Sequence, residues 1–194
     1  MNYVIVTGGA VTSHITDGSN IQFASNVFQP ASTLSAAQMT QFGVFSVTPA
    51  AQPASNPLTQ TCVETTPTLV AGVWTQTWTV SALPSAQAAQ NLYSAAIAAG
   101  LAVVSTATPA LNGTYSVAPT AAANITAIMA GAAAGLGLPG SGTTFVYMDA
   151  SGSPHTFTAA QFSTLAVAVR DYVYALDMFA AGVAPQPVAA VTIP

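Results

Sequence analysis

The side chains that could do acid–base chemistry are few in this sequence. Among its 194 residues there are one basic residue, Arg170, five acidic residues and two histidines. Arg170 stands beside Asp171 in the stretch AVAVRDYVYALD, and this lone pair first suggests an active site. Neighbouring residues on a helix do not face each other, so we expect the two side chains to point in different directions. Catalysis needs titratable groups held together with shifted pKa values, and because such groups are so scarce here we expect no enzyme and no catalytic residue.

The two histidines are the other candidates, either for a metal site or for acid–base work. His14 and His155 each have an aspartate a few residues away, Asp17 and Asp149. Neither has the H-x-x-x-H spacing that places two ligands on one helix face, and both fall in predicted turns, so we expect solvated turn histidines. The single cysteine, Cys62, has no partner at zinc spacing and is expected to be a small buried hydrophobe. The sequence therefore predicts no bound metal.

A glycine pattern and the charge balance bear on nucleotides and nucleic acids. GLGLPG at 135–140 matches G-x-G-x-x-G, which binds dinucleotides when it follows a strand and opens a helix. Here we expect it to follow a helix and lead into a strand, so a helix-to-strand loop is the simpler interpretation. The net charge of −4 and the single basic residue argue against binding to phosphate backbones. We predict no cofactor and no nucleic-acid partner.

The overall composition is unusual for a globular protein. Charged residues make up 3% of the chain, against about 25% in an ordinary protein. Apolar residues reach 52%, but the longest apolar stretches, 94–105 and 127–138, are shorter than the roughly 20 residues of a membrane span. A surface with few charges does little to keep copies apart, so the chain suits a permanent assembly. A high-GC genome, which favours Ala, Thr and Gly codons, is the alternative explanation.

The elements that must position these residues divide into a β-rich part and a mainly helical part, so the predicted fold class is α+β. Residues 1–83 form the β-rich module, with the clearest strand at 73–80. In that strand Trp74 and Trp78 share one face and a row of threonines takes the other, a pattern typical of a sheet with one buried side. The proline-rich segment 49–60 is expected to be a loop or an extended connector.

Residues 84–194 form the mainly helical module. Alanine-rich stretches predict helices at 85–100 and 119–134. A turn rich in Ser and Gly predicts a small β-hairpin near 143–157. The long final helix is expected near 159–181.

The final helix has the clearest pattern. Thr158 followed by Gln161 predicts a capping box, in which each side chain bonds the other residue's backbone N–H, and SAAQ from Ser35 has the same form. Apolar residues then recur at spacings of 3, 4, 3, 4 and 3. This seam either packs inside the domain or faces copies of the chain, and the internal position is favoured because a coiled coil usually needs at least three heptads. The seam consists of Phe162, Leu165, Val169, Tyr172, Leu176 and Phe179.

Arg170 lies on the flank of this helix, and Asp177 follows seven residues later on the same stripe. A buried or interfacial arginine needs an acidic or carbonyl partner. We interpret Arg170 and Asp177 as an orientation anchor between elements or subunits, with Asp149, Glu64 or backbone carbonyls as partners. The simpler alternative is an exposed Arg–Asp pair that contributes little.

Two long stretches resemble proteins of tailed bacteriophages. LNGTYSVAPTAAANITAIMAG and TTFVYMDASGSPHTFTAAQFSTLAVAVRDYVYALD are similar to a C-terminal domain of unknown function that recurs in tail-fibre-like and other virion-associated proteins. Upstream, LSAAQMTQFGVFSVTPAAQP and GVWTQTWTVSALPSAQAAQ resemble a β module of the same proteins. Together these stretches cover roughly residues 34–181. The resemblance supplies no catalytic residue.

The resemblance implies a structural protein of the virion, synthesised in the cytoplasm of the bacterial host. A tail fibre, fibre-attachment or tail-associated subunit is the expected role, with a contribution to host attachment by analogy. The expected partners are other virion proteins and copies of the chain in a homo-oligomer, with a trimer as one candidate and a host surface receptor as another partner. The alternatives are a capsid decoration protein, a fibre-assembly factor absent from the mature particle, and a polysaccharide hydrolase, which needs paired carboxylates.

Overall fold

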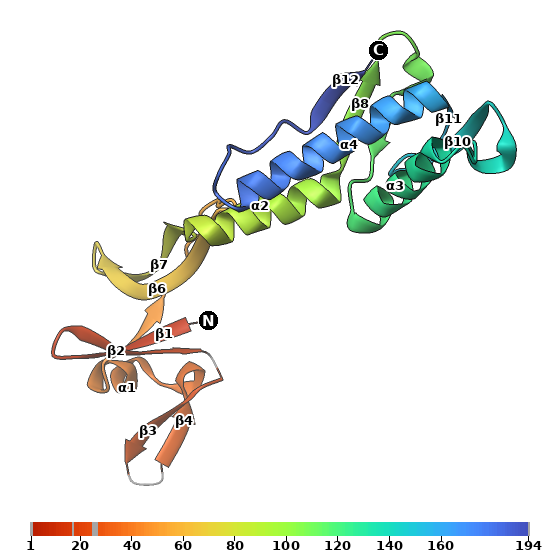
Figure 1. Cartoon of the computed structure of the whole chain (residues 1–194). Helices are drawn as coiled ribbons and strands as arrows, with labels where there is room; N and C mark the ends of the chain where they lie inside the picture. Colours follow the sequence, from red (N-terminus) through yellow and green to blue (C-terminus); the bar gives the residue numbers. More distant parts are fainter. Residues whose placement is uncertain (1, 17, 25–26, 194) are drawn as a thin grey trace. The chain divides into compact units, whose positions relative to one another are not determined.

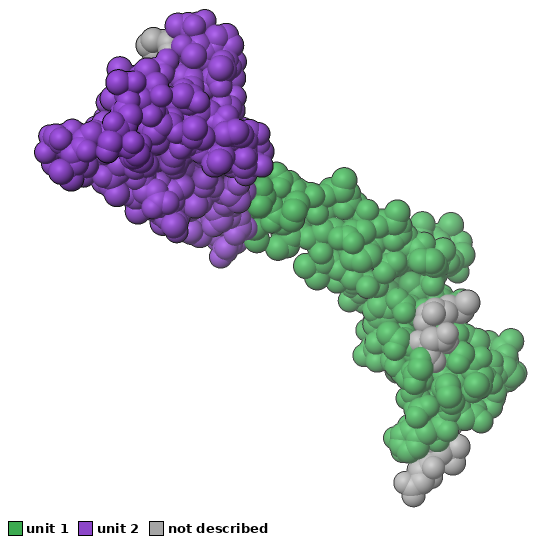
Figure 2. Space-filling model, turned by 90° about the vertical axis from the view of Figure 1, so that its right-hand side faces the viewer, with its two compact units in different colours: residues 1–83 green, residues 84–194 purple. Residues whose placement is uncertain are grey.

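The computed structural model describes residues 2–16, 18–24 and 27–193, and the chain divides into two compact units, 1–83 and 84–194 (Figure 1; Figure 2). Helix and strand each contribute 36%, with a β-rich N-terminal half and a long C-terminal helix. The predicted α+β class is therefore confirmed. Within the described ranges, no helix is both long enough and apolar enough to cross a membrane.

Short antiparallel sheets make up the N-terminal unit. Its strands are β1 (Asn2–Thr7), β2 (Ala10–Thr16), β3 (Asn20–Ala24), β4 (Val27–Pro30), β5 (Val44–Val47), β6 (Gln60–Val70) and β7 (Val73–Ala82). One sheet has the order β2-β1-β5, while β3 pairs with β4 and β6 pairs with β7.

The helix α1 (Ala36–Gln41) follows the short 3-10 helix η1 (Ala31–Thr33) and begins at a capping box. The Ser35 hydroxyl accepts from the Gln38 backbone N–H at 3.3 Å, and the Gln38 side-chain oxygen accepts from the Ser35 N–H at 2.9 Å. The helix start predicted from SAAQ is therefore confirmed. Next to α1 lies a small core of four buried residues, Tyr3, Ile21, Ala31 and Val44.

The C-terminal unit combines helices with two sheets. Its helices are α2 (Ser85–Ala99), α3 (Pro119–Ala133) and α4 (Ala159–Ala180), with 3-10 turns η2 (Pro109–Leu111) and η3 (Pro139–Ser141). Its strands are β8 (Leu101–Ser105), β9 (Gly113–Tyr115), β10 (Thr144–Met148), β11 (Pro154–Thr158) and β12 (Ala190–Ile193). The pair β10–β11 is the predicted hairpin. The other sheet has the order β12-β8-β9, and its parallel strand β12 was not predicted.

A continuous apolar core lies between the helices and sheets of this unit. The side chains come from each of the three α-helices and each of the five strands of the unit drawn in Figure 1, so these elements share one interior. Burial of this apolar surface is the main force that holds the unit together. The core consists of Ala96, Leu101, Val103, Leu111, Tyr115, Val117, Ile125, Leu138, Phe145, Phe157, Phe162, Leu165, Val169, Tyr172, Leu176 and Ile193.

Candidate functional site

Helix α4 carries most of the residues singled out in the sequence, and a capping box fixes where it begins. The Thr158 hydroxyl accepts from the Gln161 N–H at 3.3 Å, and the Gln161 side-chain oxygen accepts from the Thr158 N–H at 3.0 Å. The Gln161 side-chain amide also donates to the Thr108 hydroxyl at 3.2 Å. The predicted cap is confirmed, and it also ties α4 to the segment after β8.

The apolar seam of α4 faces the core of its own unit. Phe162, Leu165 and Leu176 are fully buried, and Val169 and Tyr172 are nearly so. Phe179, at the end of the seam, is only half-buried. The seam therefore packs inside the unit, and a second copy of the chain would have to meet α4 on another face.

Aromatic rings lock the start of α4 against the hairpin. The ring centroid of Phe162 lies 4.7 Å from that of Phe145, 5.2 Å from Tyr147 and 5.6 Å from Phe157, all in edge-on arrangements. Edge-to-face pairs of this kind are favourable beyond their area burial. Phe157, just before the cap, packs against Phe162 as a hydrophobic staple.

Arg170 binds Asp171, and the expectation that these neighbours point in different directions is wrong. The Arg170 Nε and Nη2 atoms donate to the Asp171 Oδ1 atom at 2.9 and 2.7 Å. The Cβ atoms diverge around the helix, but the long arginine side chain curls back to reach its neighbour. Both side chains are well exposed, at 71% and 61%, so this is the simpler alternative, an exposed ion pair.

The other acids proposed as partners of Arg170 have neighbours of their own. Asp149 lies beside His155, and Glu64 lies beside His14 in the N-terminal unit. Asp177 is exposed and interacts with the Tyr93 hydroxyl; burial first, and then the Asp177 carboxylate, raises the pKa of Tyr93.

The solvent-facing side of α4 carries an outer stripe, defined here as Val167, Arg170, Tyr174 and Asp177. These residues recur at spacings of 3, 4 and 3, so they lie on one face of the helix. Val167 is 44% exposed and Tyr174 is 64% exposed, which is high for large apolar or aromatic side chains. The stripe lies on the side of α4 that the unit leaves exposed.

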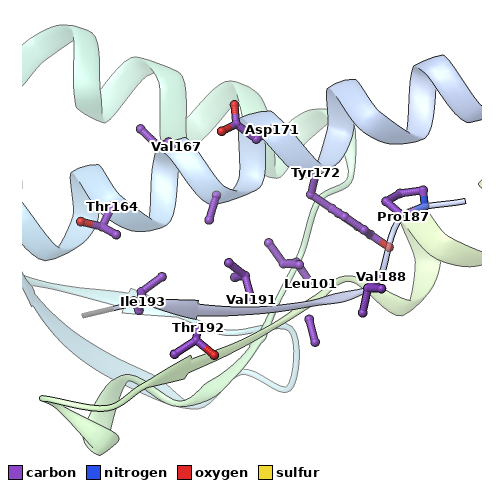
Figure 3. A pocket seen from close by; sticks show the side chains of 12 residues that line it. Leu101, Thr164, Val167, Asp171, Tyr172, Pro187, Val188, Val191, Thr192 and Ile193 are labelled. Atoms are coloured by element: carbon purple, nitrogen blue, oxygen red, sulfur yellow. The ribbon is translucent and has the colours of Figure 1, made fainter. Parts of the chain in front are cut away.

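A groove runs along each side of the outer stripe. The α3–α4 groove consists of two adjoining hollows of about 300 and 250 Å³, lined by Ile125, Thr126, Met129, Ala166, Val173 and outer-stripe residues among others. The α4–β12 groove, of about 380 Å³, lies between α4 and the chain from Pro187 to Ile193. In Figure 3, Tyr172 extends from α4 toward Pro187 and Val188. Both grooves are mainly apolar, and Arg170 lines the first.

His155 is buried, and the expectation of a solvated turn histidine is wrong. It lies on β11, not in the turn, with its Nδ1 atom 2.7 Å from the Ala110 carbonyl oxygen. Its Nε2 atom lies 3.4 Å from the Asp149 Oδ2 atom, and the two side chains are only 10% and 9% exposed. The Ala110 carbonyl can only accept, so Nδ1 carries the proton of that hydrogen bond, while Nε2 faces the carboxylate without a hydrogen bond to it.

The turn that follows β10 is organised by Asp149. Its Oδ1 atom accepts from the Ser151 hydroxyl at 2.7 Å, the Ser153 N–H at 2.8 Å and the Ser151 N–H at 2.9 Å. These hydrogen bonds, the one from the Ser151 hydroxyl foremost, lower the pKa of Asp149 to about 2, and His155 adds to the effect. The carboxylate is therefore engaged on both of its oxygens.

Gly113 and Tyr115, on β9, pack against the Asp149–His155 pair. A Cβ atom on Gly113 would lie 3.0 Å from Asp149 Oδ2 and 3.2 Å from His155 Nε2, so a larger residue does not fit without a shift. The Tyr115 hydroxyl donates to the Leu111 carbonyl at 2.7 Å, and burial, with Asp149 nearby, raises its pKa to about 12. The Asp149–His155 pair thus holds the hairpin against η2 and β9.

The sequence contains a pattern that predicts the burial of His155. Along β11, His155 and Phe157 alternate with exposed residues, and both are buried. Period-2 alternation places the two on the same face of a strand. His155 follows Ser-Gly-Ser-Pro, a sequence that predicts a turn, but the strand already begins at Pro154.

In the N-terminal unit, the tryptophans of β7 hold the chain after β5. Both Trp74 and Trp78 are half-buried. The Trp78 indole N–H donates to the Ala50 carbonyl at 3.1 Å, and the Trp74 ring lies 6.4 Å from that of Phe45. The backbone N–H of Thr48 also donates to the Trp74 carbonyl at 2.8 Å. This face of β7 therefore anchors the start of the proline-rich connector.

His14 and Cys62 differ from their predicted settings. His14 lies on β2 rather than in a turn, with its Nε2 atom 3.8 Å from Glu64 Oε1 and about a third of each side chain exposed. Asp17, the aspartate near His14 in the sequence, lies outside the described residues. Cys62 is half-buried on β6 and carries a free thiol, so it is less buried than expected.

The structure brings no cofactor-like constellation together among the residues it describes. No three His, Cys, Asp or Glu side chains of the described ranges lie close enough to share a metal ion. GLGLPG follows α3 and precedes β10, so it is the predicted helix-to-strand loop.

Fold and site together describe an α+β protein whose C-terminal unit presents the outer stripe of α4 between two mainly apolar grooves. A family model, Domain of unknown function (DUF4376), matches residues 82–183. The match covers more than half of the chain, so the protein belongs to the DUF4376 family, and such domains occur in phage proteins. No curated protein and no solved structure matches the chain.

Proposed function

We propose that this protein is a structural subunit of a bacteriophage virion, associated with the tail as a fibre or fibre-attachment component. The observation that carries the proposal is the DUF4376 domain over residues 82–183, since such domains occur in phage proteins. The charge-poor composition supports it, because a chain with 3% charged residues has few charges to place on its surface, which suits a subunit covered by neighbours. Host attachment is a role that a tail position would allow.

The proposal includes no catalytic step. Asp171 is paired with Arg170, Asp177 interacts with Tyr93, and Asp149 is engaged by Ser151, Ser153 and His155. A glycan hydrolase needs two carboxyl groups set about 5–10 Å apart around a substrate. The separate engagement of these three acids supports a structural role rather than hydrolysis.

The experiment is to identify the protein in purified particles of the phage that encodes it. Peptide mass spectrometry of intact particles, followed by immunogold labelling, is expected to find the chain in the virion and at the tail. Labelling of the capsid would instead indicate a decoration protein. Absence from mature particles, with presence in infected cells, would indicate an assembly factor and overturn the proposal.

A further inference from the structure

The outer stripe of α4 has the features of a contact between two copies of the chain. It holds an exposed aromatic residue, Tyr174, and an exposed Val167, and the α3–α4 groove runs directly beside it. Aromatic and arginine side chains that enter such hollows supply much of the binding energy at protein interfaces. The apolar seam of α4 is used inside the unit, so the outer stripe is the face that remains for a partner.

The charges on the stripe indicate which partner it fits. Arg170 is the only Lys or Arg in the chain, and Asp177 follows it by seven residues, about 10 Å along the helix. Two α4 helices that cross antiparallel, with a two-fold axis between Val173 and Tyr174, place Arg170 of each copy opposite Asp177 of the other. A parallel pairing in register would instead place the two arginines together. The stripe is thus complementary to itself in one orientation.

The same two-fold arrangement places Tyr174 of each copy against the α3–α4 groove of the other. In antiparallel register Tyr174 of one copy lies opposite Val173 of the other, and Val173 lines the α3–α4 groove. The groove there has a volume of about 300 Å³ with mainly apolar walls, which suits an inserted phenol ring. Each copy then provides one ring and one groove.

We propose that the protein forms a two-fold dimer through α4, with reciprocal Arg170–Asp177 ion pairs and reciprocal insertion of Tyr174 into the α3–α4 groove. Such an interface is isologous and closes on itself. The Arg170–Asp171 pair is exposed, so its rearrangement on binding costs little. A carboxylate accepts several hydrogen bonds, so Asp177 can bind Arg170 of the second copy while it keeps its interaction with the Tyr93 hydroxyl. The inference rests on the proposed structural role for its setting, since a virion subunit meets copies of itself, but its test needs no particles.

The test is a charge-swap series on the full chain, measured by sedimentation equilibrium. The natural protein is expected at about twice the 19.4 kDa of one chain. Arg170→Asp and Asp177→Arg each place like charges opposite one another at two symmetric points, so each is expected to weaken dimerisation at least about tenfold. The double variant restores opposite charges and is expected to recover dimerisation to within about threefold of the natural protein.

Two further variants separate the interface from general damage. Asp171→Asn removes the partner of Arg170 within the chain but not the pair between copies, so it is expected to leave dimerisation unchanged or stronger. Tyr174→Ala is expected to weaken the dimer at least about tenfold while the far-UV circular dichroism spectrum stays the same. Failure of the charge swap to rescue the dimer, or a natural protein that sediments as one or three copies, would overturn the inference. Neither result bears on whether the chain is found in virions.

Discussion

The two units of the protein differ in how much apolar surface they bury. Among the described residues, the core of the C-terminal unit contains sixteen buried side chains, whereas the N-terminal core cluster contains four. The N-terminal unit relies instead on strand pairings and on single contacts such as the Trp78–Ala50 hydrogen bond. Burial contributes far more to stability than a hydrogen bond does, so we expect the C-terminal unit to be the more stable of the two.

The two units also differ in how much their stability depends on contacts with other proteins. The family match, residues 82–183, covers nearly all elements of the unit with the large core. The N-terminal unit leaves Val63, Leu69 and Val73 about half exposed, and a two-stranded ribbon such as β6–β7 is marginally stable alone in water. We therefore expect the C-terminal unit to stay folded without a partner. Contacts with neighbouring proteins are expected to stabilise the N-terminal unit more.

The largest expected effect comes from removing a ring at the centre of the C-terminal core. Phe162→Ala loses the contacts with Phe145, Tyr147 and Phe157, and we expect it to lower the free energy of unfolding by about 3–5 kcal/mol. Urea titration with hydrogen exchange of the α4 amides measures this. Val104→Ala, at a side chain 48% exposed, is the control and is expected to change the value by less than about 0.5 kcal/mol. A loss below about 1 kcal/mol in Phe162→Ala would show that the core is not tightly packed.

Low pH is expected to reduce the difference in stability between the two units, because it destabilises the C-terminal unit. The pKa of Asp149 is lowered from its ordinary 3.8 to about 2 in the folded state, so the carboxylate form favours folding. The stabilisation is complete above about pH 3.8 and is lost as the pH falls through about 2. The urea midpoint followed from pH 6 to pH 2 should fall more steeply in the natural protein than in Asp149→Asn. Parallel curves for the two proteins would contradict the role of Asp149.

A substitution in the N-terminal unit is expected to increase the difference in stability between the units, with a smaller effect than Phe162→Ala. Trp78→Phe keeps an aromatic ring but removes the N–H that donates to the Ala50 carbonyl, and we expect a loss of about 1 kcal/mol. Hydrogen exchange should quicken at the amides of Thr48 and Ala50 while the amides of α4 stay protected. Thr79→Ala, at an exposed position of the same strand, serves as the comparison. Unchanged exchange in Trp78→Phe would mean that the indole does not anchor the connector.

The smallest effect is expected at the one arginine pair. Asp171→Asn breaks an ion pair whose two side chains are mostly exposed, so the free energy of unfolding should change by no more than about 0.5 kcal/mol. Thermal denaturation in low and high salt measures this, and the two salt conditions should differ little. A loss of 2 kcal/mol or more would show that Arg170 anchors the fold of its own unit after all.

Local patterns in the sequence were enough to predict much of the C-terminal unit. The capping box at Thr158, the 3-4 spacing of the seam and the Ser-Gly turn of the hairpin each act over a few residues, and all are present in the structure. Such features depend on neighbouring residues in the chain, so they can be recognised without the rest of the fold.

The features that were missed depend on distant partners or on long side chains. The strand β12 pairs in parallel with β8, although α3 and α4 lie between the two strands in the sequence. His155 is buried because Ala110 and Asp149 meet it, and only one of these is nearby in the chain. Arg170 reaches Asp171 because its side chain is long enough to turn back, which backbone geometry alone does not reveal.

The parallel pairing of β12 with β8 has a consequence for the order in which the molecule folds. The hairpin and the start of α4 are built from local contacts, but residues 190–193 must find residues 102–105 across α3, the hairpin and α4. Contacts between residues far apart in the chain form slowly, because closing a long loop costs entropy before the contact rewards it. We therefore expect β12 to dock last. Until it docks, β8 keeps an open edge, and a newly synthesised chain passes through a stage in which its central strand can be captured by the wrong partner.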